Sequence, residues 1–310
     1  SWTAPKFLGD GWWQSLTLDQ QNNLHVTWYG GYESPDKRAD KFHDILKYDT
    51  RSSDGTWGTV ADVIYTGDGG YTVRNSITVT TDGMLHVAYR GNVNHYVSSA
   101  PVIGATNGAN WTAPNKVLDD SYYVSMIADS NDILHLVTSG TSNVETLKPT
   151  GQTDEIYAEG AKCFRCYDLF YRRSTDEGKT WSDIVPISIA SMTGSDRPEI
   201  QQGKSGRLYI TWDEGLDWYH GGGAAQDVRM VYSDDDGLTW SPPIVLDGAG
   251  RGEARPIEFA LTELADGSLM AVWRYSTNDD RNIYYQLSSD VGKTWTEPVA
   301  IPGIVAKSEE

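Results

Sequence analysis

A turn closed by a tryptophan recurs along this chain, and its spacing constrains the fold more than any other feature. Counting degenerate copies, the tryptophans are 55, 54, 70, 59 and 55 residues apart. Self-similarity at such a period predicts an array of repeated supersecondary units. The clear copies are STDEGKTW (Ser174 to Trp181), SDDDGLTW (Ser233 to Trp240) and SSDVGKTW (Ser288 to Trp295); degenerate copies end at Trp57 and Trp111, and the sequence opens with Ser1-Trp2.

Each repeat also contains a short apolar strand after a turn. The copies are NNLHVTWY, GMLHVAYR, DILHLVTS, GRLYITWD and GSLMAVWR. Alternating segments on either side bring the number of strands to four per repeat, and helical periodicity is nearly absent. Four-stranded antiparallel units repeated radially are the blades of a β-propeller. We therefore predict an all-β, single-domain β-propeller over residues 1–310, with five complete blades plus an N-terminal outer strand at Ser1 to Asp10; a six-bladed ring is the alternative.

The repeated turn predicts a structural role for its own residues. Its Asp can accept hydrogen bonds from the backbone N–H groups that follow, its Ser can add another, and its Gly can take a positive φ angle. The tryptophan supplies a large apolar surface for packing between blades. Because catalysis needs one site and this turn occurs in nearly every repeat, the motif is expected to maintain the scaffold.

The pattern S-x-D-x-G-x-T-W is similar to the Asp box, or BNR repeat, of bacterial sialidases and related propellers. The resemblance implies the propeller fold and suggests a glycan-degrading enzyme, such as a sialidase-like glycoside hydrolase. Asp boxes also occur in polysaccharide-degrading enzymes and in non-catalytic receptors, so the activity has to be argued from the site.

Composition narrows the classes of partner. The net charge of −18 argues against nucleic acid, and no apolar run of about 18 residues is present, so membrane insertion is not expected. No basic-then-apolar leader opens the sequence, so a secretion signal was either removed or never there. An acidic chain with 12 Trp and 18 Tyr is typical of a secreted or extracytoplasmic protein whose partner is a carbohydrate.

No cofactor or metal is expected. The two cysteines, Cys163 and Cys166, form a CxxC without a second pair of ligands at zinc spacing. Free thiols are the favoured interpretation, while a loop disulfide and half of a metal site stay open.

Candidate site residues come from aligning the repeats. In a propeller the first strand of each blade starts at one rim of the central tunnel, and the position eleven residues before each second-strand leucine lies there. The residue at this position differs between repeats, whereas the scaffold residues around it are alike, as a single central site would require. The alternative explanation is ordinary variation of surface residues at strand starts. The five residues are Trp13, Arg74, Tyr123, Arg197 and Glu258.

The ends of the second strands are expected to reach the same rim. Aromatic rings beside charged groups suit sugars, although Trp28, Trp212 and Trp273 could equally be packing between blades, and the acidic pair could be a solvated loop. The residues at these ends are Trp28, Tyr29, Tyr89, Arg90, Trp212, Asp213, Glu214, Trp273 and Arg274.

The histidines divide into two groups. His25, His86 and His135 share one repeated position and are predicted to be scaffold. His43, His95 and His220 lie near loops that face the predicted site, and any one of them could act there or be an ordinary surface residue. The longest of these loops cover residues 139–166, 215–226 and 30–40, where binding sites are commonly built.

The sialidase resemblance implies roles for some of these residues. Glu258, in EFALTELADGSLMAVWR, resembles the sialidase Glu that assists a tyrosine nucleophile, and Arg74 and Arg197 fit an arginine clamp on a substrate carboxylate, with Arg255 or Arg274 as a third member. Tyr123 could supply the nucleophile only by a rearranged order. Ile257 stands where sialidases usually have Asn, and no Arg-Ile-Pro segment is present.

Three alternatives therefore remain open beside a true sialidase. The first is a hydrolase with a carboxylate pair among Asp213, Glu214 and Glu258. The second is a lyase that uses Tyr, His and Arg. The third is a non-catalytic propeller that binds glycan or protein. Glu258, Tyr123 and Asp213 are the catalytic candidates.

Overall fold

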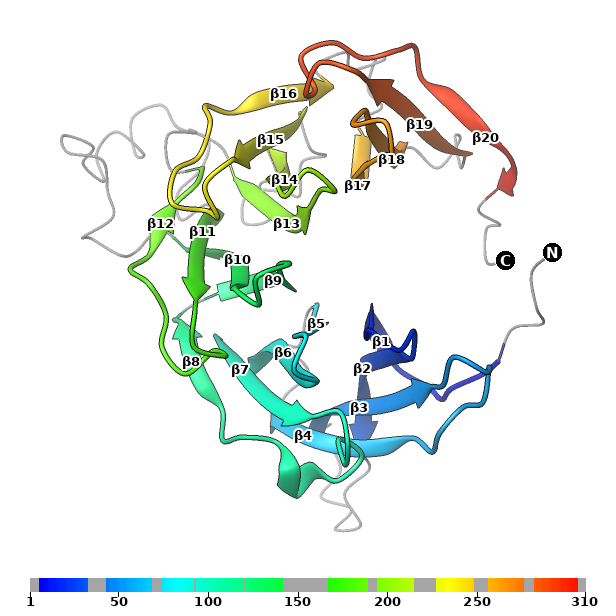
Figure 1. Ribbon diagram of the computed structural model, residues 1–310, viewed down its shortest axis with the longest axis vertical. Helices are drawn as coiled ribbons and strands as arrows, with labels where there is room; N and C mark the ends of the chain where they lie inside the picture. The colour runs from blue at the N-terminus through cyan, green and yellow to red at the C-terminus, as the bar shows by residue number, and fades with distance from the viewer. Residues whose placement is uncertain are drawn as a thin grey trace. The chain divides into compact units, whose positions relative to one another are not determined.

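In the computed structural model the described residues form five four-stranded antiparallel sheets, and in each sheet the strands follow one another in sequence order (Figure 1). This confirms the predicted all-β fold with four-stranded propeller blades and the count of five complete blades. The one helical element among the described residues is a single 3-10 turn, Gly108–Asn110. The structure describes residues 6–32, 43–68, 74–91, 93–119, 121–141, 167–188, 194–214, 227–247, 256–275 and 282–305.

The first two blades each consist of four consecutive strands. Blade 1 consists of β1 (Trp12–Leu18), β2 (Leu24–Tyr32), β3 (His43–Arg51) and β4 (Ala61–Asp68). Blade 2 consists of β5 (Ser76–Val79), β6 (Met84–Gly91), β7 (Asn94–Pro101) and β8 (Asn115–Leu118).

The remaining three blades have the same order. Blade 3 consists of β9 (Ser121–Ala128), β10 (Leu134–Thr141), β11 (Tyr167–Ser174) and the short β12 (Val185–Pro186). Blade 4 consists of β13 (Ser195–Gln202), β14 (Leu208–Glu214), β15 (Asp227–Ser233) and β16 (Ile244–Asp247). Blade 5 consists of β17 (Pro256–Glu263), β18 (Leu269–Tyr275), β19 (Asn282–Ser288) and β20 (Val299–Val305).

The predicted N-terminal outer strand does not appear in the part of it that can be described. Lys6 to Asp10 form no strand, and residues 1–5 lie outside the described residues. Chain contacts divide the molecule into two compact units. Unit 1 covers residues 1–134 and 174–181, and unit 2 covers residues 135–173 and 182–310.

In unit 1 the core joins blades 1 and 2. The tryptophan of the second degenerate turn, Trp111, is buried there: its indole N–H donates to the Ala105 carbonyl at 2.8 Å, and its ring meets Tyr48 edge-on at 6.3 Å. This is the packing role predicted for the turn tryptophans. The other large members of this core are Tyr29, Leu46, Ile64, Ile77, Leu85, Val87 and Tyr89.

Hydroxyl side chains join the first strands of neighbouring blades in unit 1. The Ile77 amide of β5 donates to the Ser15 hydroxyl of β1 at 3.0 Å. The Met126 amide of β9 donates to the Ser76 hydroxyl at 2.9 Å, and that hydroxyl donates back to the Met126 carbonyl at 3.0 Å. These bonds join the beginning of β5 to the middle of β1 and to the last residues of β9, so the first strands of the three blades are held at a fixed spacing.

In unit 2 the core joins blades 4 and 5. Trp295, from the last clear turn, packs against this core, and its indole N–H donates to the Gly292 carbonyl at 3.0 Å. The buried members include Tyr209, Val228, Met230, Leu246, Phe259, Leu261, Leu269 and Trp273.

The three clear Asp boxes have the same hydrogen bonds, as the sequence predicts. In the second box the Ser233 hydroxyl donates to Asp235 at 2.8 Å and accepts from the Gly237 amide at 2.9 Å. Asp235 also accepts from the Thr239 amide at 2.8 Å and the Thr239 hydroxyl at 2.6 Å. The equivalent threonine hydroxyls in the other two boxes hold the pKa of Asp176 and Asp290 down to about 2.

The three repeated histidines are scaffold residues, as predicted. His25 and His135 each bond a tyrosine hydroxyl at 2.7 Å, through Tyr48 and Tyr171 respectively. His86 lies between Ser99 at 2.8 Å and Thr80 at 3.3 Å. All three histidines are at most 1% exposed.

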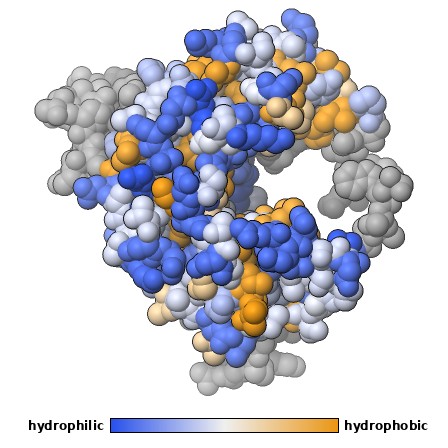
Figure 2. Space-filling model, in the orientation of Figure 1, coloured by the Kyte–Doolittle hydropathy of each residue, from blue (hydrophilic) through white to orange (hydrophobic). Residues whose placement is uncertain are grey.

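Hydrophilic side chains cover most of the face drawn in Figure 2, with smaller apolar patches between them. Within the described ranges, no helix is long and apolar enough to cross a membrane.

Candidate functional site

The residues predicted for the site lie where the first strands begin, and three of those strands carry a β-bulge at this point. The pairing register of a first strand with its second strand shifts between Trp12 and Ser15 in β1, between Asp196 and Glu199 in β13, and between Ile257 and Ala260 in β17. Trp13, Arg197 and Glu258 fall inside these three bulges. Because a bulge turns a side chain away from the regular alternation, it is a common device beside functional sites.

Two of these bulge residues have a left-handed backbone. The φ angle is 54° at Trp13 and 51° at Arg197. A side chain in this region costs on the order of 1–2 kcal/mol compared with ordinary strand geometry. The surrounding contacts must therefore stabilise both conformations, and such outliers concentrate at sites of function.

In unit 1 the structure brings four predicted residues together with one unpredicted tyrosine, and we call this group the arginine–aromatic cluster: Trp13, Arg74, Arg90, Tyr122 and Tyr123. The Trp13 ring meets the Tyr123 ring edge-on, with centroids 6.0 Å apart. The Arg74 guanidinium lies over the same tyrosine ring, 5.6 Å from its centroid. Trp13 is 39% exposed whereas Tyr123 is 5% exposed, so the indole forms the open side of the cluster.

A second arginine–tyrosine pair adjoins the first. The Arg90 guanidinium lies 5.0 Å from the centroid of Tyr122, whose ring is 4.8 Å from that of Tyr123. The Tyr29 hydroxyl accepts from the Arg90 amide at 3.2 Å and so fixes the end of β6. Two guanidinium groups beside three aromatic rings suit a ligand that has both an anionic group and an apolar face.

His95 lies behind this cluster and supports it. Its Nε2 is 3.1 Å from the Tyr122 carbonyl, which can only accept, so the proton is on Nε2. Burial, and then the nearby Arg90 charge, lower the pKa of His95 to about 3. With no exposed surface, this neutral histidine positions the Tyr122 main chain and does not reach a ligand.

In unit 2 the end of β14 carries two buried carboxylates with different partners. Asp213 lies 3.4 Å from the Arg197 Nη1. Glu214 accepts from the Ser195 hydroxyl at 2.8 Å and from the Trp212 indole at 2.7 Å. Successive strand residues point to opposite faces, so Asp213 faces the predicted arginine while Glu214 bonds to Ser195 and Trp212 and holds the strand ends together.

The predicted tryptophans of the second strands are buried. Trp28 is 5% exposed, and Trp212 and Trp273 are each 1% exposed. This is the arrangement that the packing interpretation predicts, and it leaves little of any of the three rings open to a ligand. Tyr29 and Tyr89 are buried in the unit 1 core in the same way.

Several predicted residues, or their side chains, lie outside the described part of the structure. Glu258 and Arg274 lie on β17 and β18, and His43 begins β3, but their side chains fall outside the described residues. Arg255, His220, Cys163 and Cys166 and most of the three long loops also fall outside them.

The geometry brings to the site three residues that the sequence did not indicate: Tyr122, Asn75 and Ser195. Strand alternation assigns Tyr122 to the face opposite Tyr123, yet the two rings meet at 88°. Asn75 and Ser195 make their hydrogen bonds to other strands, so only the pairing of strands could have revealed them.

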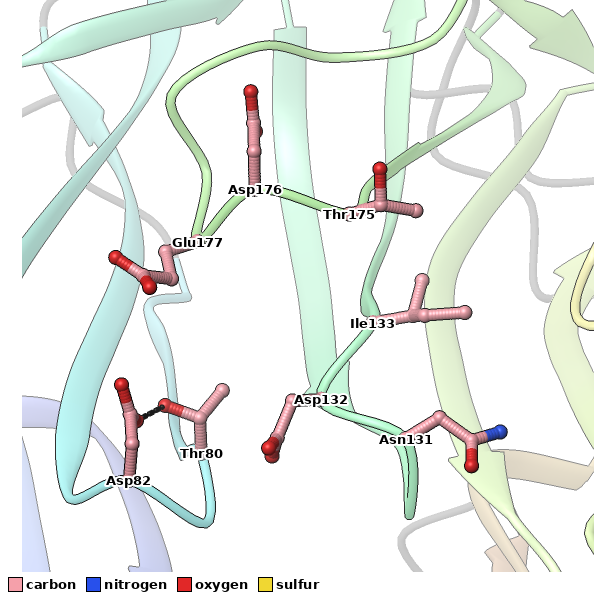
Figure 3. A pocket seen from close by; sticks show the side chains of 8 residues that line it. All are labelled: Thr80, Asp82, Asn131, Asp132, Ile133, Thr175, Asp176 and Glu177. Carbon is pink, nitrogen blue, oxygen red and sulfur yellow. Dashed lines mark hydrogen bonds between the residues drawn. The ribbon is translucent and has the colours of Figure 1, made fainter.

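A separate acidic pocket lies at the Asp-box end of unit 1 (Figure 3). It has a volume of 240 Å³ and is formed by three turns. Its carboxylates already serve those turns: Asp82 accepts from Thr80 at 2.6 Å, Asp132 accepts from the Thr81 amide at 2.7 Å, and Glu177 pairs with Lys179 at 2.9 Å. Among the described residues no group of His, Cys, Asp and Glu side chains is arranged to hold a metal ion.

The chain is similar in sequence to two known sialidase-type proteins. It is 26% identical over 189 residues to an anhydrosialidase of Macrobdella decora, a match that covers 55% of this chain and 22% of that protein. It is also 26% identical over 167 residues to a sialidase of Clostridium perfringens, covering 44% of this chain and 41% of that protein. The chain thus spans less than half the length of either relative.

A solved structure of similar fold is an ulvan lyase, a polysaccharide lyase bound to a GlcA(1-4)Rha3S ligand. The TM-score is 0.62 at 14% identity, and the alignment covers 97% of this chain and 72% of the lyase. At this identity the likeness shows the fold alone. The BNR repeat-like domain family matches residues 102–306, about two thirds of the sequence, so the chain belongs to that family.

Proposed function

We propose that this protein is a glycan-degrading enzyme that binds an acidic carbohydrate at the arginine–aromatic cluster. The observation that carries the proposal is the cluster itself, in which Trp13 and Arg74 both lie against Tyr123 at the start of the first strands. A sugar presents an apolar ring face and polar edges, and an acidic sugar adds a carboxylate or sulfate. The indole suits the ring face, while a guanidinium fork matches the anionic group.

The charge distribution supports an anionic ligand. The chain as a whole carries a net charge of −18, which repels anions at long range. A few arginines in one place can reverse that field locally, and Arg74 and Arg90 are both held over tyrosine rings in the cluster. The names of the related proteins point the same way, since they include sialidases and a lyase bound to a uronic-acid-containing sugar.

Tyr123, Glu258 and Asp213 remain the proposed catalytic residues. Tyr123 offers a phenol inside the cluster, and Glu258 occupies a bulge equivalent to that of Trp13. Asp213 lies 3.4 Å from the Arg197 guanidinium, so its carboxylate is held beside a cation at the end of β14. Hydrolysis would add water across the glycosidic bond, whereas elimination would leave an unsaturated sugar; the product distinguishes them.

The decisive experiment is product analysis on a panel of sialosides, uronic-acid polysaccharides and neutral glycans. We expect turnover of an acidic glycan, a loss of at least about 100-fold in kcat for Tyr123→Phe and Glu258→Gln, and a KM raised about tenfold or more for Arg74→Ala. Arg197→Lys is preferable to Arg197→Ala because it leaves a cation beside the buried Asp213. Asp234→Ala, at an exposed ion pair with Arg207, serves as the control that should keep full activity.

No turnover on any substrate would refute the enzymatic proposal. Binding of acidic glycans on an array, lost in Arg74→Ala, would then identify a carbohydrate-binding propeller. We further propose a location outside the cytoplasm, which secretion of the full-length protein would test.

A further inference from the structure

A buried amide connects the first blade to the arginine–aromatic cluster. Asn75 follows Arg74 directly, precedes β5, and is 4% exposed. Its Nδ2 donates to the main-chain carbonyl of Trp13 at 2.5 Å. Its Oδ1 accepts from the Thr27 hydroxyl of β2 at 2.6 Å.

The chemistry of these groups fixes the orientation of the amide. The Trp13 carbonyl can only accept a hydrogen bond, so the NH₂ group of Asn75 must face it. The Oδ1 atom then faces Thr27, whose hydroxyl is the donor. Thr27 therefore orients Asn75, and Asn75 in turn holds Trp13.

We propose that Asn75 is a positioning residue of the arginine–aromatic cluster: it holds the bulge of β1 in the left-handed conformation that directs the Trp13 ring at Tyr123. Trp13 has a φ angle of 54°, which an L-residue leaves readily unless a contact holds it. On the far side of the same bulge, the Ser15 hydroxyl accepts from the Ile77 amide at 3.0 Å. The bulge is thus held on one side by Asn75, which precedes β5, and on the other side by Ile77 of β5.

The position of Asn75 makes the proposal specific to the site. One two-residue segment provides both the guanidinium over Tyr123, from Arg74, and the anchor of the indole at the edge of that ring, from Asn75. Any movement of this segment would displace both contacts to Tyr123 together.

Blade 4 offers a matched comparison. Thr211 pairs with Glu199 beside the bulge of β13, as Thr27 pairs with Ser15 beside the bulge of β1. Thr211 is 1% exposed, and its hydroxyl has no hydrogen-bond partner in the described part of the chain. Thr211→Val therefore removes a buried hydroxyl at the position equivalent to Thr27, but unlike Thr27→Val it breaks no hydrogen bond among the described residues.

The test uses ¹⁹F NMR of the full chain labelled with 5-fluorotryptophan, with the Trp13 resonance assigned by its loss in Trp13→Phe. We expect Asn75→Ala and Thr27→Val to shift or broaden the Trp13 resonance by more than its line width, while the resonances of Trp181, Trp240 and Trp295 stay in place. Thr27→Ser, which keeps the donor, and Thr211→Val should leave the Trp13 resonance where it is. If Asn75→Ala does not fold, the comparison of Thr27→Val with Thr27→Ser decides alone.

An unchanged Trp13 resonance in Thr27→Val, or an equal change in Thr211→Val, would overturn the proposal. This measurement needs no substrate, so its outcome is independent of the proposed function. The activity arm rests on that function: on any acidic glycan that is turned over, Asn75→Ala should lower kcat/KM about tenfold or more without altering the pH profile. If the unsubstituted protein turned over no glycan, the enzyme proposal would be refuted, and the NMR result would still test the role of Asn75.

Discussion

At the scale of single residues, the site depends on side chains that occupy unfavourable or solvent-excluded places. Trp13 and Arg197 have positive φ angles at equivalent points of blades 1 and 4. Asp213 and Glu214 are buried carboxylates, each held by a partner from the beginning of β13. Such groups are costly unless every contact is kept, so substitutions near them will affect stability as well as function.

The buried histidines predict how stability depends on pH. Burial lowers the pKa of His86 to about 4 from an ordinary value of 6.5, although Asp82, Glu177 and Asp132 favour its charged form. A histidine with a depressed pKa binds fewer protons in the folded state than in the unfolded state. Its contribution is therefore fully present above pH 6.5 and is lost as the pH falls toward 4, by about 3 kcal/mol.

Urea unfolding between pH 7.5 and 4 measures this dependence. We expect the free energy of unfolding to fall with pH in that window, and to fall less steeply in His86→Phe. The Asp-box carboxylates act in a different window, because their lowered pKa values withdraw stability only as the pH falls from 3.8 toward 2. An identical slope in the His86 variant would contradict the prediction.

At the scale of elements, the Asp boxes fix how a turn of one blade packs on its neighbour. Gly237 of the second box has a φ angle of 77°, and a Cβ atom there would collide with the Tyr171 hydroxyl. Tyr171 is 1% exposed and bonds the His135 Nδ1 at 2.7 Å, so it has little freedom to move. Glycine is therefore required at position 237 for two reasons: the positive φ angle and the close approach of the Tyr171 hydroxyl.

A pair of alanine substitutions separates those two requirements. Gly206 has a similar φ angle of 87°, but a Cβ there would have no atom within 4 Å. We expect Gly206→Ala to lower the free energy of unfolding by about 1 kcal/mol, from backbone strain alone, and Gly237→Ala to lower it by about 3 kcal/mol. Chemical denaturation of both variants measures the difference, and equal losses would mean that the Tyr171 contact is readily relieved.

At the scale of the whole molecule, the five described blades repeat one strand order, whereas the side chain at the start of the first strand differs from blade to blade. A four-stranded sheet has two faces to bury and is not expected to be stable alone. The single domain over residues 1–310 stays a prediction. Net charge acts at this scale too, since −18 opposes an anionic ligand everywhere except where arginines gather.

Equilibrium unfolding tests the single domain. We expect one cooperative transition in urea, with the midpoint from circular dichroism equal to that from tryptophan fluorescence. Two separated transitions would instead show that the two compact units unfold independently. Ligand binding at the cluster in unit 1 would then stabilise only one of the transitions.

The repeated features are encoded locally in the amino-acid sequence. Asp, Ser, Thr and Gly of the box specify its turn through bonds within a few residues, and the strand periodicity specifies four strands per blade, so both were predictable. The scaffold histidines were predictable because repetition distinguishes them from a single site. The register of the repeats also predicted that Trp13, Arg74 and Tyr123 lie at one rim of the tunnel, together with Arg197 and Glu258.

The contacts between these side chains, in contrast, depend on how the strands pair in three dimensions. The bulges, the left-handed backbone of Trp13, and the contribution of Asn75 and Tyr122 arise from pairing between strands far apart in sequence. The same pairing buries Trp28 and Trp212, which the sequence left open between packing and binding. The physical reason is that turn hydrogen bonds and strand periodicity depend on residues close together in the sequence. The orientation of a site side chain depends on the residues that the neighbouring blade packs against it.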